Sequence, residues 1–115
     1  MAEECIFCRI VAGEIPADIV YQDKDFLAFR DIMPKAPTHV LIIPKTHIAS
    51  AAELTEGQAE LAGRLIIMAK NLAKKEGIAR KGYRLVINCG SEGGQVVPHL
   101  HLHLLGGRQM EAKFG

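Results

Sequence analysis

The sequence predicts an α+β protein in which one long helix and a short N-terminal helix pack on a mainly antiparallel sheet of five strands. Hydrophobic residues recur at helical spacing in one long segment, residues 55–77. Several shorter segments are rich in Val, Ile and Phe and are bounded by Pro, Gly or Asp, which is typical of strands. With 115 residues, of which 49% are hydrophobic, the chain can build one compact core, so we expect a single domain over residues 1–115.

The N-terminal half predicts a short helix and three strands. In "ECIFCRIVAG", Ile6 and Ile10 lie on one helical stripe and Gly13 provides the stop. Segment 18–32 alternates β-type residues around the polar "QDKD", which favours two antiparallel strands joined by a tight turn. The apolar run "THVLIIPK", residues 38–45, favours a third strand that is buried on both faces.

The C-terminal half predicts the long helix and two further strands. Thr55 can cap a helix that ends in a lysine-rich turn before Gly77. The expected buried face of this helix carries Leu61, Leu65, Met68 and Leu72. "YRLVINCG", residues 83–90, and "PHLHLHLLGG", residues 98–107, favour a fourth and a fifth strand with a glycine-rich loop between them.

Composition and charge exclude several classes of partner. The chain has 14 Lys and Arg residues and 13 Asp and Glu residues, so its net charge of +1 gives no general attraction to nucleic acid or to a membrane surface. No apolar run reaches membrane-spanning length, and acidic residues stand where a secretory signal would carry positive charge. We therefore expect a cytoplasmic protein that binds neither nucleic acid nor membranes.

The cysteines predict metal or redox chemistry rather than a disulfide framework. Cys5 and Cys8 have C-x-x-C spacing, which in a reducing compartment favours a metal or redox site. Cys89 stands alone, and we expect it to be a small buried residue.

The segment "VPHLHLHLLGG" places His99, His101 and His103 at every second position. Because successive side chains of a strand point to opposite faces, the three imidazoles share one face and the leucines between them share the other. Three half-buried imidazoles each need hydrogen-bond partners, and they add nothing to packing that Val or Thr would not add. The pattern therefore predicts a functional site.

Two kinds of site fit this triplet. Imidazoles on one strand face can bind a zinc ion, or one histidine can act as a nucleophile that its neighbours tune. The preceding loop provides Gly90, Gly93 and Gly94 for close backbone approach to a phosphate, with Ser91 and Gln95 as hydrogen-bond donors. The loop favours an anionic substrate, while metal binding and nucleophilic catalysis both stay open for the triplet.

These residues resemble the histidine triad (HIT) family, whose signature is three histidines separated by apolar residues. The resemblance runs through "CIFCRIVAGEIPA", "FLAFRDIMPKAPTHVLIIPKTHI" and "GGQVVPHLHLHLLGGRQM", which together cover nearly the whole chain. Within the family, the short chain and "LLGGRQM" are most similar to the branch of nucleotide-binding proteins that are purine nucleoside phosphoramidases. The resemblance implies a HIT-like fold and a homodimer whose sheets join edge to edge through the fourth-strand region and the long helix.

The resemblance also implies an activity. It is hydrolysis of purine nucleoside 5′-phosphoramidates, or related nucleotidyl substrates of the AMP or GMP type, at the α-phosphate. His101 would be the nucleophile and would form a nucleotidyl-histidine intermediate, with a backbone carbonyl near His99 fixing its tautomer. His103 and His39 would hydrogen-bond within the site and stabilise the charge of the phosphate. No cofactor is expected for the catalysis.

The nucleotide-binding residues follow by similarity as well. The apolar walls of the base pocket match Phe7, Ile10, Ile15 and Phe29. The residues that hold the ribose hydroxyls and flank the base match Asp31 and Ile32. The phosphate and sugar contacts match Asn88, Gly94 and Gln95. Val96 stands in the site where well-known phosphoramidases have a serine that assists the leaving amine, and the C-terminal "EAKFG" replaces an aromatic-rich end. The resemblance therefore does not fix the leaving-group preference.

A structural zinc ion is the third implication. Bacterial-type members with C-x-x-C bind zinc through residues that match Cys5, Cys8, His47 and His99 here. Two thiolates and two imidazoles make a closed tetrahedral set with no open position for water. Such a zinc ion would brace His99 and would take no part in hydrolysis.

Three rival functions remain at this stage. One is a diadenosine polyphosphate hydrolase, and another is a nucleotide-binding adaptor with little turnover, which Val96 and the altered tail suggest. The last is a zinc-dependent hydrolase that uses the three histidines as metal ligands.

Overall fold

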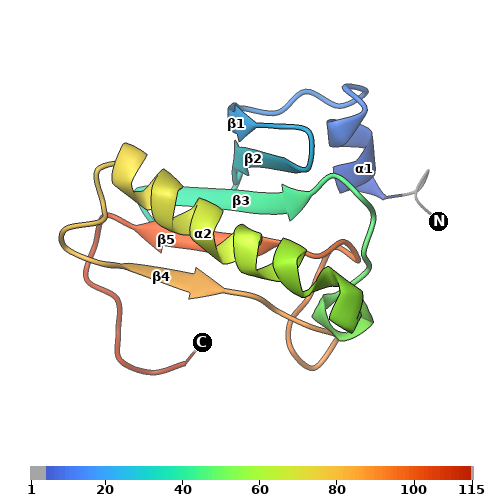
Figure 1. Cartoon of the computed structure of the whole chain (residues 1–115). Coiled ribbons are helices and arrows are strands. Elements are labelled where there is room, and N and C mark those ends of the chain that lie inside the picture. The colour runs from blue at the N-terminus through green and yellow to red at the C-terminus, as the bar shows by residue number, and fades with distance from the viewer. Residues whose placement is uncertain (1–4, 115) are drawn as a thin grey trace.

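The computed structural model describes residues 5–114, which form an α+β fold on one five-stranded sheet (Figure 1). In chain order the elements are α1 (Ile6–Val11), β1 (Ile19–Gln22), β2 (Phe26–Arg30), β3 (Thr38–Pro44), the 3₁₀ turns η2 (Ala51–Glu53) and η3 (Glu56–Gln58), α2 (Ala59–Lys75), β4 (Tyr83–Val86) and β5 (Leu102–Gly106). All neighbouring strands are antiparallel, in the order β1-β2-β3-β5-β4. The predicted fold class is confirmed.

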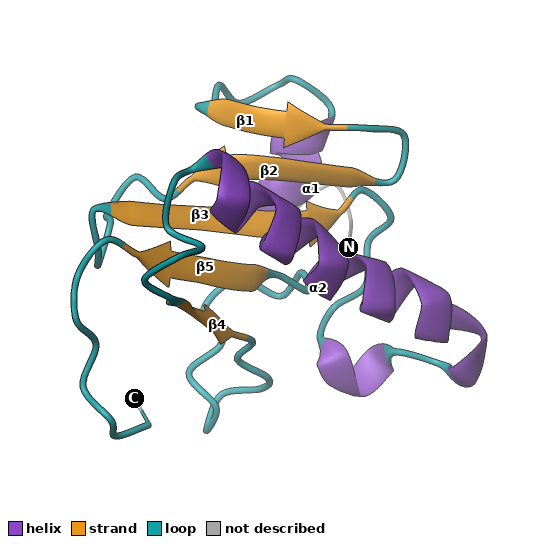
Figure 2. Ribbon diagram, turned by 60° about the vertical axis from the view of Figure 1, so that its left-hand side comes forward, coloured by secondary structure: helices purple, strands orange, loops and turns teal. Residues whose placement is uncertain are grey.

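The two faces of the sheet carry different helices and separate apolar clusters. α2 lies across one face and α1 lies behind the sheet at β2 (Figure 2). Phe26 and Ala28 of β2 pack in the cluster under α2, whereas Leu27 and Phe29 pack with α1. Every residue of β3 is buried, as predicted for a strand covered on both faces.

In the triad segment, residues 98–107, the buried leucines determine which way the histidines face. Leu100, Leu102 and Leu104 are almost fully buried in the cluster under α2. The histidines between them therefore face the α1 side. β5 pairs with β3 only from Leu102 onwards, so His99 and His101 precede the paired strand, which is shorter than the predicted 98–107.

Pro44 explains why the pairing stops there. Proline has no N–H for a neighbouring strand, and the carbonyl oxygen of Pro44 accepts a hydrogen bond from His99 Nε2 at 2.8 Å. The Leu100 N–H donates instead to the Ile48 carbonyl at 2.6 Å. Side-chain and loop contacts thus hold the first two histidines where the ladder ends.

The helix signals are confirmed, with one change at the start of α2. Gly13 and Gly77 follow the two helices, each with a φ of +79°. Thr55 and Gln58 form the predicted type of cap, but on η3, so that α2 begins at Ala59. Within residues 5–114, no helix is both long and apolar enough to cross a membrane.

β4 is shorter than predicted, and this corrects one prediction. Its last pair joins Val86 to His103, and beyond that point the chain leaves the sheet. Cys89 therefore lies in a loop and is exposed, so the prediction that it is buried is wrong. The loop is tight because Gly93 passes close to Cys89: a Cβ on Gly93 would lie 2.3 Å from the Cys89 carbonyl oxygen.

Candidate active site and metal centre

A cavity of about 560 Å³ opens on the α1 side of the sheet, with α1, β2, β3, β5 and the loop before β5 in its walls. The predicted site residues that line it are Phe7, Ile10, Ile15, Phe29, Asp31, Ile32, His39, Asn88, Gly94, Val96, His101 and His103. Ile32 and Val96 are almost fully exposed and form part of its rim. Residues far apart in the sequence thus meet in one cavity.

His101 is buried beside Phe7, and its tautomer is fixed by the backbone. Its Nδ1 lies 2.6 Å from the carbonyl oxygen of His99. Because a carbonyl oxygen can only accept, Nδ1 carries the proton and Nε2 keeps its lone pair. The Phe7 ring packs edge-on against the imidazole, with centroids 5.2 Å apart. The side chain lines the cavity, and in the neutral form of the ring its Nε2 is the nucleophilic nitrogen.

His39 and His103 form a hydrogen-bonded relay whose protons can be placed in the same way. The backbone N–H of Lys35 donates to His39 Nδ1 at 3.1 Å, so the proton of neutral His39 is on Nε2. His39 Nε2 lies 2.9 Å from His103 Nδ1 and therefore donates to it. The remaining His103 nitrogen, Nε2, must carry the other proton. His103 is thus set as a donor beside His101, whose ring centroid is 5.0 Å away.

Burial keeps this relay neutral. Burial, followed by the neighbouring His101 and His39, lowers the pKa of His103 to about 4. Burial also lowers the pKa of His39, although the charge of nearby Asp31 opposes the change. Both rings are therefore uncharged at neutral pH, as the assigned protons require.

A possible metal site overlaps the His39 and His103 relay, which concerns the alternative of a zinc-dependent hydrolase. Ligand atoms of Asp31, His39 and His103 lie within 4.8 Å of one another, which is close enough to suggest a metal site. His39 Nε2, however, donates a hydrogen bond to the lone pair of His103 Nδ1. The cluster contains one histidine of the triplet, His103, and its side chains are paired by hydrogen bonds.

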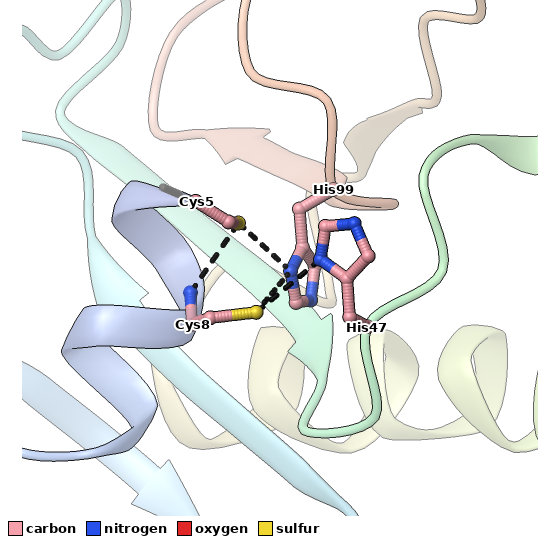
Figure 3. Close-up of side chains that lie close together, drawn as sticks. All are labelled: Cys5, Cys8, His47 and His99. Atoms are coloured by element: carbon pink, nitrogen blue, oxygen red, sulfur yellow. Dashed lines mark hydrogen bonds between the residues drawn. The ribbon is translucent and has the colours of Figure 1, made fainter. Parts of the chain in front are cut away.

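A second cluster gathers the predicted metal ligands. Cys5, Cys8, His47 and His99 converge from α1, the segment after β3 and the segment before β5 (Figure 3). Cys5 Sγ lies 3.3 Å from His99 Nδ1, and Cys8 Sγ lies 3.2 Å from His47 Nδ1 and 3.5 Å from His99 Nδ1. Ligands of a tetrahedral zinc ion with normal bond lengths stand about 3.6 Å apart for a sulfur and nitrogen pair.

The chemistry of the donors also fits zinc. His99 is fully buried, and its Nε2–H donates a hydrogen bond to the carbonyl of Pro44. The lone pair on Nδ1 is therefore directed at the sulfurs of Cys5 and Cys8. A metal-binding histidine is held by a second hydrogen bond of this kind. In the absence of a cation, burial and then the neighbouring Cys5 raise the pKa of Cys8 to about 11. A divalent cation reverses that preference because it stabilises thiolates.

Some predicted residues have a different setting from the one expected. Gln95 and His99 lie outside the lining of the cavity. The Gln95 side chain accepts from the Gly90 N–H at 2.9 Å and donates to the carbonyls of Ala49 at 2.8 Å and Val97 at 3.0 Å. It therefore braces the loop before β5 instead of facing the cavity, because three backbone groups saturate its amide.

Sequence reasoning missed two groups that fix the histidines. These are the backbone N–H of Lys35 and the carbonyl of Pro44. Neither contact depends on the side chain of the residue, so no signal in the sequence could have revealed it. Asp31 shows a related limit: its carboxylate accepts from the Met33 N–H at 2.8 Å and so also shapes the loop after β2.

Comparison with known proteins identifies the family. The family model described as the HIT domain matches residues 12–110 of the chain. The chain belongs to the HIT domain family. The chain is 52% identical over 110 residues to the purine nucleoside phosphoramidase of Escherichia coli (strain K12), which covers 96% of this chain and 92% of the relative.

Solved structures agree with this assignment to the HIT domain family. A HIT family hydrolase from Legionella pneumophila Philadelphia 1 is 57% identical, with a TM-score of 0.93 over 95% of this chain and 97% of that chain. A zinc-bound histidine triad family protein from Mycobacterium smegmatis is 30% identical, with a TM-score of 0.80 over 97% of this chain and 81% of that chain. The predicted fold and family are therefore confirmed.

Proposed function

We propose that this HIT protein hydrolyses purine nucleoside 5′-phosphoramidates, or related nucleotidyl compounds of the AMP or GMP type, through a covalent intermediate on His101. The observation that carries the proposal is the hydrogen bond from His101 Nδ1 to the His99 carbonyl, which leaves a lone pair on Nε2 of a residue that lines the cavity. The similarity to a purine nucleoside phosphoramidase supports the substrate class.

The proposed reaction has two steps at phosphorus. His101 Nε2 attacks the α-phosphate, the phosphorus–nitrogen bond breaks, and the amine leaves in its protonated form. Water then hydrolyses the nucleotidyl-histidine bond and releases the nucleoside monophosphate. His103, which carries its proton on Nε2, donates a hydrogen bond to a phosphate oxygen and stabilises the charge that develops there. No metal takes part in either step.

The rest of the cavity serves recognition in this proposal. The purine packs against the apolar walls formed by Phe7, Ile10 and Phe29, and the Asp31 carboxylate accepts hydrogen bonds from the ribose hydroxyls. Val96, 88% exposed at the rim, cannot supply a proton to a leaving amine. Solvent at the open rim provides that proton instead, so the enzyme favours amines that are basic enough to leave protonated.

The Cys/His cluster holds a structural zinc ion in this proposal, through Cys5, Cys8, His47 and His99. The ion supplies a rigid crosslink between α1 and the segment that carries the triad. Since the backbone carbonyl of His99 accepts the hydrogen bond from His101 Nδ1, bracing His99 also positions the nucleophile. A reduced, cytoplasmic setting belongs to the proposal because zinc needs both thiols free.

A homodimer also belongs to the proposal. β4 forms one edge of the sheet, and an apolar edge needs a partner. Ile66 and Ile67 of α2 and Ile87 after β4 are large apolar side chains that are about half exposed. A second copy that pairs at β4 and packs on α2 would cover these side chains and make the sheet continuous.

The experiment is a turnover assay with adenosine 5′-phosphoramidate, comparing the wild type with His101→Ala. Loss of the nucleophile should reduce kcat by at least about 10³-fold while adenosine monophosphate still binds. A wild type that binds nucleotide without turnover would favour the adaptor function. That function is considered because the exposed Val96 cannot supply a proton to a leaving amine. Faster cleavage of diadenosine polyphosphates than of the phosphoramidate would favour the other rival.

A further inference from the structure

The loop between β2 and β3 holds the relay through one residue, Lys35. Its N–H donates to His39 Nδ1 at 3.1 Å and so decides which nitrogen of His39 carries the proton. Its carbonyl oxygen accepts two hydrogen bonds from Arg108, from Nε at 3.2 Å and from Nη2 at 3.0 Å. Both backbone groups of Lys35 are thus anchored, one to the relay and one to a guanidinium.

We propose that Arg108 is a positioning residue for the proposed reaction: by clamping the Lys35 carbonyl it keeps the Lys35 N–H on His39 and thereby fixes the protons of the His39 and His103 relay. The proposal rests on the proposed function. Arg108 is exposed and lies outside the cavity lining, so it acts through the loop and not through the substrate.

The chain is built to bring Arg108 to this loop. Gly107, which follows β5, has a φ of +95°, a conformation that L side chains rarely adopt. A Cβ on Gly107 would lie 2.9 Å from Pro37 Cβ, so the segment after β5 runs directly against the end of the loop. The next residue is Arg108, whose Nε and Nη2 lie on one side of the planar guanidinium and converge on the Lys35 carbonyl oxygen.

The consequence of losing the clamp follows from hydrogen-bond chemistry. While the Lys35 N–H points at His39, a proton on Nδ1 would set two donors face to face, so only the Nε2 tautomer is allowed. If the loop moves, both tautomers of His39 become accessible. In the Nδ1 tautomer, His39 no longer donates to His103, and His103 loses its fixed role as a donor to phosphate.

The test compares Arg108→Gln and Arg108→Lys with the wild type, and uses Arg80→Gln, an exposed arginine in the turn between α2 and β4, as the control. Arg108→Gln should lower kcat about tenfold, the effect of one lost hydrogen bond to the relay, while KM stays within about twofold. Arg108→Lys keeps one donor and should recover part of the loss. Arg80→Gln should keep wild-type kinetics.

A spectroscopic measurement separates positioning from a general structural role. Imidazole nitrogen NMR of the wild type should show His39 as a single Nε2–H tautomer, and Arg108→Gln should show a mixture of tautomers. An unchanged tautomer or unchanged kcat in Arg108→Gln would overturn the inference, as would a loss confined to KM. An equal loss in Arg80→Gln would also overturn it.

The test still gives an answer if one variant does not fold or if the wild type shows no turnover. Should Arg108→Gln not fold, as judged by circular dichroism and thermal melting, Arg108→Lys provides the same two readouts. Should the wild type lack phosphoramidate turnover, the proposed function fails, yet the tautomer of His39 still decides whether Arg108 positions the relay.

Discussion

Acidification should destabilise this protein well above the pH at which its carboxylates titrate. The reason is the buried relay: burial lowers the pKa of His103 to about 4, from an ordinary value of 6.5. The unfolded chain therefore binds a proton between pH 6.5 and pH 4 that the folded protein does not bind. Stability is complete above pH 6.5 and falls as the pH drops toward 4.

The size of the effect can be worked out for His103 alone. Relative to pH 8, the free energy of unfolding should fall by about 2 kcal/mol at pH 5 and by about 3 kcal/mol at pH 4. Burial lowers the pKa of His39 and of His99 as well, so both act in the same direction. The His103 figure is thus the smallest loss to expect.

Urea unfolding at a series of pH values from 8 to 4.5 measures the loss. A chelator in every sample removes the contribution of metal ligands that protonate in the same range. The matched variant is His103→Gln, whose amide can still accept from His39 but cannot titrate in this range. Its stability should depend less steeply on pH, with about 2 kcal/mol less loss at pH 5.

Two results would show that burial does not keep these histidines neutral. A wild-type stability that is flat or rises between pH 6.5 and pH 5 would mean that the relay histidines protonate normally in the folded state. Equal pH slopes for the wild type and His103→Gln would mean that the loss arises elsewhere. Either result would also remove the basis for assigning fixed protons to the relay.

Three further predictions concern the metal cluster, the loop before β5 and the packing of β5. The wild type should contain one zinc ion per chain by elemental analysis, Cys8→Ser should contain none, and a chelator should lower the Tm of the wild type only. Gln95→Ala removes three hydrogen bonds and should cost about 2 kcal/mol in urea unfolding, against less than about 0.5 kcal/mol for the exposed control Gln22→Ala. Gly106→Ala should cost about 2 kcal/mol, since its new Cβ would lie 2.5 Å from Ile78 Cδ1, and an unchanged Tm would contradict this close packing.

The fold was predictable because its main elements have strong periodicity. The helical spacing in residues 55–77 and the apolar run in residues 38–45 give α2 and β3 directly. Alternation in the triad segment gives the face of each side chain, and that holds even where the backbone is not paired. The start of β5 was not predictable, because it depends on Pro44, which lies far away in the sequence.

The sequence named candidate side chains but not the backbone groups that orient them. Most residues named from the family resemblance line one cavity, and the four predicted metal ligands converge in one cluster. The backbone groups that fix the protons of His39 and His103 have no signature in the sequence, so the contacts of Lys35 and Arg108 were not predicted. Gln95 could not be assigned from sequence either, since an amide can bind a phosphate or brace a loop equally well.

In the proposed reaction, His101 becomes covalently attached to the nucleotide during turnover. The direct measurement is mass spectrometry of protein mixed with adenosine 5′-phosphoramidate and quenched within the first turnover in alkaline denaturant, followed by peptide mapping. We predict a mass increase of one adenosine monophosphate group on the peptide that contains residues 99–103, assigned to His101 and absent from His101→Ala. Turnover at full rate in that variant, or an adduct on another residue, would contradict the account.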